Sequence, residues 1–264
     1  MRHLAAFQAS LAVGTTFLNV TAVNDGLLTV AASNRVTLPA DGEVEFAYLQ
    51  STTMQRGRFN FPQARRLWLP QIRPVTVGVV SGSDPNVASF LRHPLPIVRD
   101  QEFGLEAVHG GAGAETVTGF VGLSFPGVPY AYARGQPTAG SFKQRFVGST
   151  TLTANAWTTC ALTADDTFPP GYYAIVGVEA FGTTMIAARL IIPGAGPFRP
   201  GVIATQTIGQ RPHDIFRALQ SPLSLDEFGY FYTTALPTLE AFATAADTAQ
   251  TVTLDLVPVE LLSA

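Results

Sequence analysis

The sequence has little charge, a single cysteine and a single lysine. Only 13 % of its 264 residues are charged, whereas 47 % are hydrophobic, and the net charge is −3. The lone Cys160 excludes an internal disulfide, and its setting in WTTCALT predicts a buried small apolar residue. No apolar run approaches the roughly 18–20 residues that span a bilayer. The N-terminal stretch MRHLAAFQASLAVG is short and interrupted by Gln8, so we expect no cleaved leader.

A basic arm is also missing from both ends of the sequence, and the arginines are scattered along the chain. Proteins that capture nucleic acid through its phosphates concentrate Lys and Arg on one face or in one tail. We therefore expect no sequence-specific binding to nucleic acid.

Motifs for catalysis are scarce as well. The four histidines are His3, His93, His109 and His213, and no two of them form a His-x-His pair. The single Lys143 in AGSFKQ excludes a Walker A motif, and GLSFPG has Pro126 where a nucleophile elbow needs its second glycine. The acidic pairs Asp165-Asp166 and Asp226-Glu227 lie in turn-like contexts typical of solvated loops. We expect no enzyme activity, no metal and no cofactor; the alternative is a two-histidine, one-carboxylate metal site assembled from distant loops.

Short β-type segments dominate what the sequence does contain. EVEFAYL, TVTGFVGLSF, YYAIVGVEAF, MIAARLII and TVTLDLV are rich in β-branched and aromatic residues, with Gly, Pro, Asn and Asp between them. This spacing is typical of a β-sandwich or barrel. Two short helices are predicted as loop insertions, one over DPNVASFLRH (residues 84–93) and one from about Pro212 in RPHDIFRALQ.

The two halves of the chain repeat several short phrases in the same order. Thr52-Thr53-Met54 matches Thr183-Thr184-Met185, 131 positions later, and at the same separation Arg58 matches Arg189 and Pro62 matches Pro193. Two further matches follow: Glu102-Phe103-Gly104 with Glu227-Phe228-Gly229, and Ala114-x-Thr116-Val117-Thr118 with Ala249-x-Thr251-Val252-Thr253. The agreement of order, spacing and segment type predicts an internal duplication. The matched prolines should each end the strand that begins at the Thr-Thr-Met phrase, because proline cannot donate to a central ladder.

The duplication divides the chain into units of similar size. We predict an all-β protein of two tandem jelly-roll, or Greek-key sandwich, domains: residues 1–126, a linker over 127–140, and residues 141–264. Residues 21–126 and residues 153–264 should superimpose as two sandwiches.

Two such units in tandem resemble the double jelly-roll major capsid proteins of tailless icosahedral viruses, many of which infect bacteria. The resemblance covers the whole chain at the level of architecture and size. It implies a homotrimer whose six similar domains form a pseudo-hexameric capsomer. The implied partners are the chain itself, neighbouring capsomers and other virion proteins, with an internal membrane as a further candidate. The implied location is the virion, after synthesis in the host cytoplasm.

The low charge fits a shell protein independently of the resemblance. A subunit that covers much of its surface with neighbours needs few charges there, because obligate interfaces are more apolar than ordinary surface. A mean hydropathy of +0.22 is unusual for a soluble monomer.

The one local concentration of charge is the arginine group Arg56, Arg58, Arg65 and Arg66. Arg56 and Arg58 would share one side of a strand, with Arg65 and Arg66 in the loop after it. One interpretation is a solvated face. The other is a contact with acidic residues of a neighbouring subunit, or with lipid or nucleic acid inside a shell.

A lectin-like or receptor-binding β-sandwich module is the alternative function. It would account for the fold and for the scarcity of catalytic motifs. Sugar sites usually place exposed aromatic side chains beside carboxylates and amides, however, and both Trp68 and Trp157 lie in apolar, strand-like contexts.

Overall fold

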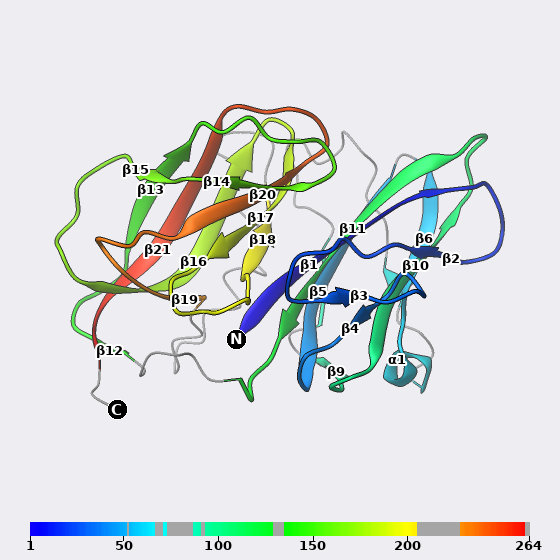
Figure 1. Ribbon diagram of the computed structural model, residues 1–264, viewed down its shortest axis with the longest axis horizontal. Helices are drawn as coiled ribbons and strands as arrows, with labels where there is room; N and C mark the ends of the chain where they lie inside the picture. The colour runs from blue at the N-terminus through cyan, green and yellow to red at the C-terminus, as the bar shows by residue number, and fades with distance from the viewer. Residues whose placement is uncertain are drawn as a thin grey trace. The chain divides into compact units, whose positions relative to one another are not determined.

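The computed structural model describes residues 1–51, 53–66, 71–72, 87–90, 93–128, 135–204 and 228–261. The chain divides into two compact units (Figure 1). We call Leu4–Gly127 the first unit, and Val128–Ala264 together with Met1–His3 the second unit.

The first unit contains two β-sheets. One has the strand order β1-β11-β5-β8, with β9 also paired to β5; the other has the order β3-β4-β10-β6-β7, with β2 also paired to β10. Its elements are β1 (Arg2–Leu11), β2 (Leu18–Val20), β3 (Thr29–Val30), β4 (Val36–Thr37), β5 (Gly42–Gln50), β6 (Met54–Asn60), α1 (Pro62–Arg66), β7 (Gln71–Ile72), β8 (Ala88–Ser89), β9 (Leu95–Ile97), β10 (Glu102–His109) and β11 (Glu115–Ser124).

The second unit also contains two sheets. One has the order β15-β13-β21-β16-β19, with β12 also paired to β21; the other has the order β14-β20-β17-β18. Its strands are β12 (Gly135–Pro137), β13 (Phe142–Gly148), β14 (Trp157–Cys160), β15 (Thr163–Ala164), β16 (Tyr172–Gly182), β17 (Met185–Ile191), β18 (Gly201–Ile203), β19 (Gly229–Tyr232), β20 (Thr238–Ala243) and β21 (Gln250–Leu261).

The same strand order runs through both units. In one sheet of each unit, the order β1-β11-β5-β8 (with β9 beside β8 on β5) corresponds to the order β13-β21-β16-β19. In the other sheet, the order β2-β10-β6-β7 corresponds to the order β14-β20-β17-β18. The strands pair antiparallel, as β11 does with β5 and β21 with β16. Two facing antiparallel sheets that share this four-position order make a jelly-roll sandwich, so the predicted all-β fold class is confirmed.

Irregularities in the ladders are repeated too. Glu45 in β5 and Val176 in β16 are each the extra residue of a bulge opposite the central strand. In the facing sheets, Gln55 in β6 and Ile186 in β17 are the extra residues. Each bulged residue lies 131 positions from its counterpart, the separation of the Thr-Thr-Met phrases. Because a bulge is a specific backbone feature that families retain, this coincidence supports a duplicated structure more strongly than the short sequence matches do.

The core of each unit lies between its two sheets. In the first unit, the rings of Phe7 in β1 and Phe103 in β10 lie 6.1 Å apart across the sandwich. A Cβ on Gly57 of β6 would lie 2.0 Å from Leu49 Cδ1 of β5, so a residue without a side chain lets the sheets approach. In the second unit, Cys160 is buried as predicted, and its Sγ lies 3.2 Å from Oε1 of Gln250.

The matched phrases can now be placed on the strands. Met54 and Met185 begin the corresponding strands β6 and β17, and Pro62 and Pro193 each follow two residues after the strand end, as predicted. The Thr-Val-Thr match lies on corresponding strands but is two residues out of register. In the first unit Thr118 pairs with Gln50. The residue of β16 that corresponds to Gln50 is Phe181, and it pairs with Thr251, whereas the sequence match had aligned Thr118 with Thr253. Because side chains alternate between the two faces of a strand, a shift of two residues keeps each matched side chain on the same face of the sheet.

The Glu-Phe-Gly match is wrong. Glu102–Gly104 lie in β10, which pairs with β6, whereas Gly229 begins β19, which pairs with β16, and Glu227 lies outside the described residues. The strand that corresponds to β10 is β20.

The predicted helices also need correction. Within residues 84–93, Ala88–Ser89 form strand β8 paired with β5, because the sheet edge offers hydrogen bonds that a short isolated helix cannot match; the rest falls partly outside the described residues. The helix predicted from Pro212 lies entirely outside them. In the described ranges, the helix present is α1, where a loop was expected, with Pro62 at its first position.

The predicted linker over 127–140 is not a plain connection. Gly135–Pro137 form β12, which pairs with the end of β21, while residues 129–134 lie outside the described part.

Among the described residues, no helix has the length and apolar character needed to cross a membrane.

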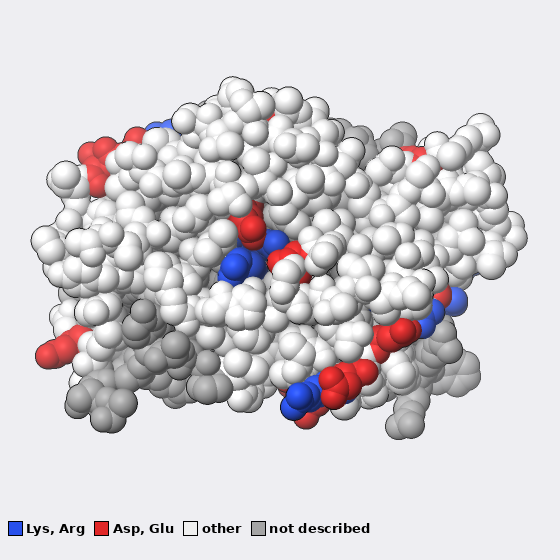
Figure 2. All heavy atoms as spheres, viewed as in Figure 1, with Lys and Arg blue, Asp and Glu red and all other residues white. Residues whose placement is uncertain are grey.

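Charged side chains are sparse on the surface. Figure 2 shows one face on which Lys, Arg, Asp and Glu gather in a few small groups, most of them of mixed sign, while uncharged residues cover most of the rest. In the described chain, large exposed hydrophobic side chains are few: Val13, Leu18, Val98 and Tyr172. The face in Figure 2 is therefore mainly uncharged, and the described part of the chain exposes few large apolar side chains.

Candidate functional site

An arginine–glutamate pair crosses the corresponding sheet of each unit. In the first unit, Arg58 of β6 lies directly opposite Glu106 of β10. The Arg58 guanidinium contacts Glu106 Oε2 through Nε at 2.7 Å and through Nη2 at 2.6 Å. Asn60, two residues along β6, donates from Nδ2 to the other oxygen of the same carboxylate. The pair thus fastens β6 to β10 beyond the backbone ladder.

The second unit repeats this pair at the corresponding positions. Arg189 of β17 lies opposite Glu240 of β20, and Arg189 Nε donates to Glu240 Oε2 at 2.7 Å. The Arg189 side chain is only 1 % exposed and that of Glu240 17 %. Arg58 is more accessible, with 29 % of its side chain exposed. A buried guanidinium needs such a partner, because an unpaired charge in this setting costs several kcal/mol.

An aromatic ring covers each arginine. The guanidinium carbon of Arg58 lies 3.8 Å from the centre of the Phe17 ring, and that of Arg189 lies 4.0 Å from the Trp157 ring. Phe17 immediately precedes β2 and Trp157 begins β14, which are corresponding strands. Such stacking adds attraction between the cation and the ring face. We call Phe17, Arg58 and Glu106 the first arginine cluster, and Trp157, Arg189 and Glu240 the second.

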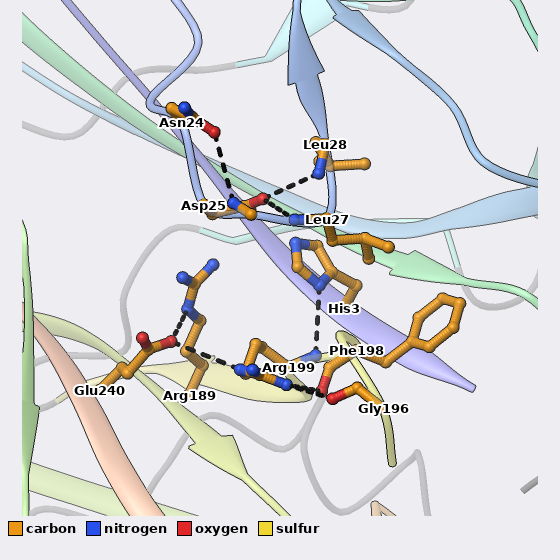
Figure 3. Close-up of polar contacts among 11 residues, drawn as sticks. His3, Asn24, Asp25, Leu27, Leu28, Arg189, Gly196, Phe198, Arg199 and Glu240 are labelled. Carbon is orange, nitrogen blue, oxygen red and sulfur yellow. Dashed lines mark hydrogen bonds and ion pairs between the residues drawn. The ribbon is translucent and has the colours of Figure 1, made fainter.

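Additional contacts surround the second cluster (Figure 3). Arg199 brings a second guanidinium to Glu240, with Nε 3.8 Å from Oε2. The Arg199 amide donates to Nδ1 of His3 at 3.2 Å, and its Nη1 donates to the carbonyls of Gly196 and Phe198 at 2.6 and 3.0 Å. These bonds fix the loop that follows β17. Figure 3 also draws the first unit's turn in which Asp25 Oδ1 accepts from the amides of Leu27 and Leu28.

The chemistry of both clusters is structural. Each carboxylate accepts hydrogen bonds from the guanidinium opposite it, so the charge of the paired arginine is balanced within the chain. Each cluster links two neighbouring strands of one sheet.

The predicted arginine group is only partly assembled. Arg56 and Arg58 share one side of β6, as expected, since both guanidinium groups lie over Phe17, that of Arg56 at 5.3 Å. Arg56 is exposed, whereas the charge of Arg58 is balanced by Glu106. Arg65 and Arg66 end helix α1 instead of lying in a loop, and their side chains are outside the described part. A contact of this group with a partner stays a prediction.

The sequence did not reveal the two glutamates or the two rings. Arg58 and Arg189 are 131 positions apart, but Glu106 and Glu240 are 134 apart because the loops before β10 and β20 differ in length. Their common role becomes visible only once the strand pairing is known. A fixed-offset comparison of the two halves could not have found it.

A histidine links two turns of the first unit only. Nδ1 of buried His109 lies 3.0 Å from the Thr53 hydroxyl and 3.3 Å from Glu115 Oε2, and Nε2 contacts the Gly113 carbonyl. In the second unit, Ala243 occupies the place of His109 in the ladder, and the Thr184 amide donates to Asp247 Oδ2 at 3.0 Å. In the first unit the Thr53 amide likewise donates to Glu115 Oε1 at 3.0 Å, so a bond from a threonine amide to an acidic side chain is common to both units, and the histidine is an addition in one.

The single lysine lies in an acidic setting. Lys143 Nζ contacts Glu179 at 2.6 Å and Asp255 at 2.8 Å, from three adjacent strands of one sheet. Partial burial lowers the pKa of Lys143, but hydrogen bonds and attraction from Asp255 and Glu179 outweigh it, so the pKa lies above its ordinary value. An amine held charged in this way is a poor nucleophile. Nearby, Arg145 contacts Asp165 at 3.1 Å.

Within the described ranges, no three His, Cys, Asp or Glu side chains are placed to hold a metal ion. His3 and His109 are buried and His93 is exposed, while His213, Asp226 and Glu227 lie outside those ranges. A small hollow is lined by aromatic and apolar residues: Tyr172, Pro193, Tyr230, Phe231, Tyr232 and Ala235. None of these lining residues is a carboxylate or an amide, the groups expected beside an aromatic platform in a sugar site.

Comparison with known proteins shows a structural likeness but no sequence match. No protein-family profile matches the chain, and none of the curated proteins matches it in sequence. Among solved structures, the crystal structure of the major capsid protein P2 from bacteriophage PM2 aligns over 98 % of this chain and 98 % of that chain, at 13 % identity and a TM-score of 0.23.

Proposed function

We propose that this chain is a structural coat subunit of a bacteriophage that works by self-association. In this proposal three chains form a trimer, the trimer is a pseudo-hexameric capsomer, and capsomers build an icosahedral shell. The partners are further copies of the chain and other virion proteins. The site of action is the virion, and no catalytic step is involved.

The observation that carries this proposal is the detailed equivalence of the two units. They share strand order, two bulges and an arginine–glutamate–aromatic cluster at corresponding positions. A chain with two such units repeats the same strand framework twice, so three chains arranged around an axis offer six similar units. A closed ring of this kind uses one repeated heterologous interface. A scaffold that is duplicated in this detail is suited to assembly.

The composition of the surface supports the same proposal. Charged residues make up 13 % of the chain, against about a quarter in ordinary soluble proteins. The cores of protein–protein interfaces are depleted in charge. A mainly neutral surface therefore favours extensive association with other subunits over solvation as a monomer.

Electron microscopy of the purified protein tests this function. Rings or shells built from a repeating unit with three-fold symmetry are expected. Isolated single particles at all concentrations, together with selective binding on a glycan array, would instead support the lectin-like or receptor-binding module. The protein should also be present as a major component of particles in cells that express it with its neighbouring genes.

A further inference from the structure

The corresponding outer faces of the two units differ in chemistry. By outer face we mean the side of a sheet that points away from its facing sheet in the same unit. On the β1-β11-β5 sheet of the first unit this face carries Phe46, Tyr48 and Phe120, each no more than 1 % exposed. On the β13-β21-β16 sheet of the second unit, the counterpart of Tyr48 is Glu179, and the counterpart of Gly122 is Asp255.

One part of the outer face of the second unit is charged and accessible, while the adjoining part carries buried apolar residues that include Val257 and Val259. Lys143 is 52 % exposed, Glu179 32 % and Asp255 22 %. One ammonium against two carboxylates leaves one negative charge in excess, and Arg145 and Asp165 beside them balance each other. We call Lys143, Glu179 and Asp255 the acidic face.

The first unit carries the opposite excess on its other sheet. There, Arg56, Arg58 and Phe17 lie on the outer side of β6 and β2, and Glu106 balances only one of the two arginines. We call Arg56, Arg58 and Phe17 the arginine face. At the place of Arg56 the second unit has Ala187, which is buried, so the fold itself does not require a cation at this position.

We propose that the acidic face of one copy docks against the arginine face of the next. The two faces lie on different sheets and different units, carry opposite charge excesses and are both accessible in the single chain. Each chain has one of each, so the contact is heterologous and can close into a ring. Charge complementarity would set the register of the contact and steer the encounter more than it would supply affinity. The proposal rests on the coat-subunit function and adds to it which surfaces meet.

Charge reversal tests the contact. Arg56→Glu and Glu179→Lys each place like charges opposite one another, so each variant should raise the dissociation constant of self-association by about tenfold or more. The double variant Arg56→Glu with Glu179→Lys restores opposite charges with reversed polarity, and its association should recover. Arg99→Glu is the matched control, because Arg99 is 69 % exposed and its ion pair is with the adjacent Asp100.

The outcomes separate this inference from the function on which it rests. Sedimentation analysis of the wild-type protein and the four variants, with circular dichroism to check folding, gives the readout. A wild-type protein that stays monomeric would contradict the coat-subunit function itself. Two results would overturn only the proposed contact, provided that the wild-type protein assembles. In one, both single variants assemble as well as the wild type. In the other, the double variant assembles no better than the single variants.

Discussion

At the scale of single residues, the two arginine clusters share one geometry but differ in burial. Arg189 is 1 % exposed and Arg58 is 29 % exposed, although both pair with a glutamate directly opposite on the neighbouring strand. The energetic weight of an ion pair depends on burial, because a charge left without its partner costs most where water cannot reach it. The second cluster should therefore matter more for stability than the first.

Replacing Glu240 with Gln should destabilise the second unit by about 3–5 kcal/mol, because the buried Arg189 guanidinium loses its carboxylate. The corresponding Glu106→Gln should cost less, on the order of 1 kcal/mol, since water reaches Arg58. Hydrogen exchange during mild urea denaturation reports each unit separately and measures both effects. Equal losses in the two variants would contradict the link between burial and cost.

Tyr48 is the second residue with a testable consequence. Its side chain is fully buried, and its hydroxyl has no hydrogen-bond partner among the described residues. Burial raises the pKa of this phenol far above its ordinary value of 10.0. The unfolded chain loses the phenol proton above about pH 10 while the folded chain keeps it, so stability falls as pH rises past that point.

Replacing Tyr48 with Phe should therefore stabilise the protein by about 1 kcal/mol at neutral pH, because an unsatisfied buried hydroxyl is removed. It should also reduce the loss of stability above about pH 10. Lys143, whose pKa is raised as well, contributes stability at neutral pH that is lost as pH rises through its own pKa, so part of the alkaline decline should remain. Thermal unfolding of both proteins from pH 7 to 11 gives the comparison; parallel curves would refute this assignment.

At the scale of elements, close contact between the two sheets depends on glycine at one position. A Cβ on Gly57 would lie 2.0 Å from Leu49 Cδ1, so Gly57→Ala must push the Leu49 side chain aside. The expected cost is about 1–3 kcal/mol of the first unit's stability. Gly127→Ala is the control, because a Cβ there meets nothing within 4 Å, and it should be nearly neutral. Urea denaturation measures both, and a neutral Gly57→Ala would show that the sheets yield easily.

The elements also show what sequence alone could and could not predict. Strands with strong β-type composition, such as β11 and β16, and the prolines after β6 and β17 were predictable, because propensity and ring geometry act locally. Strand β8 was mistaken for part of a helix, because Asp-Pro and a following apolar pattern resemble a helix start while the pairing with β5 is a long-range effect. Glu106 and Glu240 were missed for the same reason: their role comes from the neighbouring strand.

At the scale of the whole molecule, duplication is the feature on which the proposed function rests. The repeated phrases pointed to it, and the repeated bulges and clusters give it structural detail. Phe46 and Phe120 are buried in a single copy of the chain, whereas charged faces of opposite sign are accessible. We propose that further copies of the chain cover these faces.

Salt should weaken the association if opposite charges guide it. Raising the ionic strength from about 0.05 to 0.5 M shortens the range of electrostatic attraction to a few ångströms, so the dissociation constant should rise. The expected sign is opposite for an assembly held by apolar contacts alone, which added salt strengthens or leaves unchanged. A titration followed by light scattering distinguishes the two.

The mass of the purified protein in solution tests the central claim most directly. At micromolar concentration a trimer of the 28.0-kDa chain, about 84 kDa, or a larger multiple of it is expected in mass photometry or analytical ultracentrifugation. A single species at 28.0 kDa that persists as the concentration is raised would contradict the account, because a subunit that works by self-association cannot be a stable monomer under those conditions.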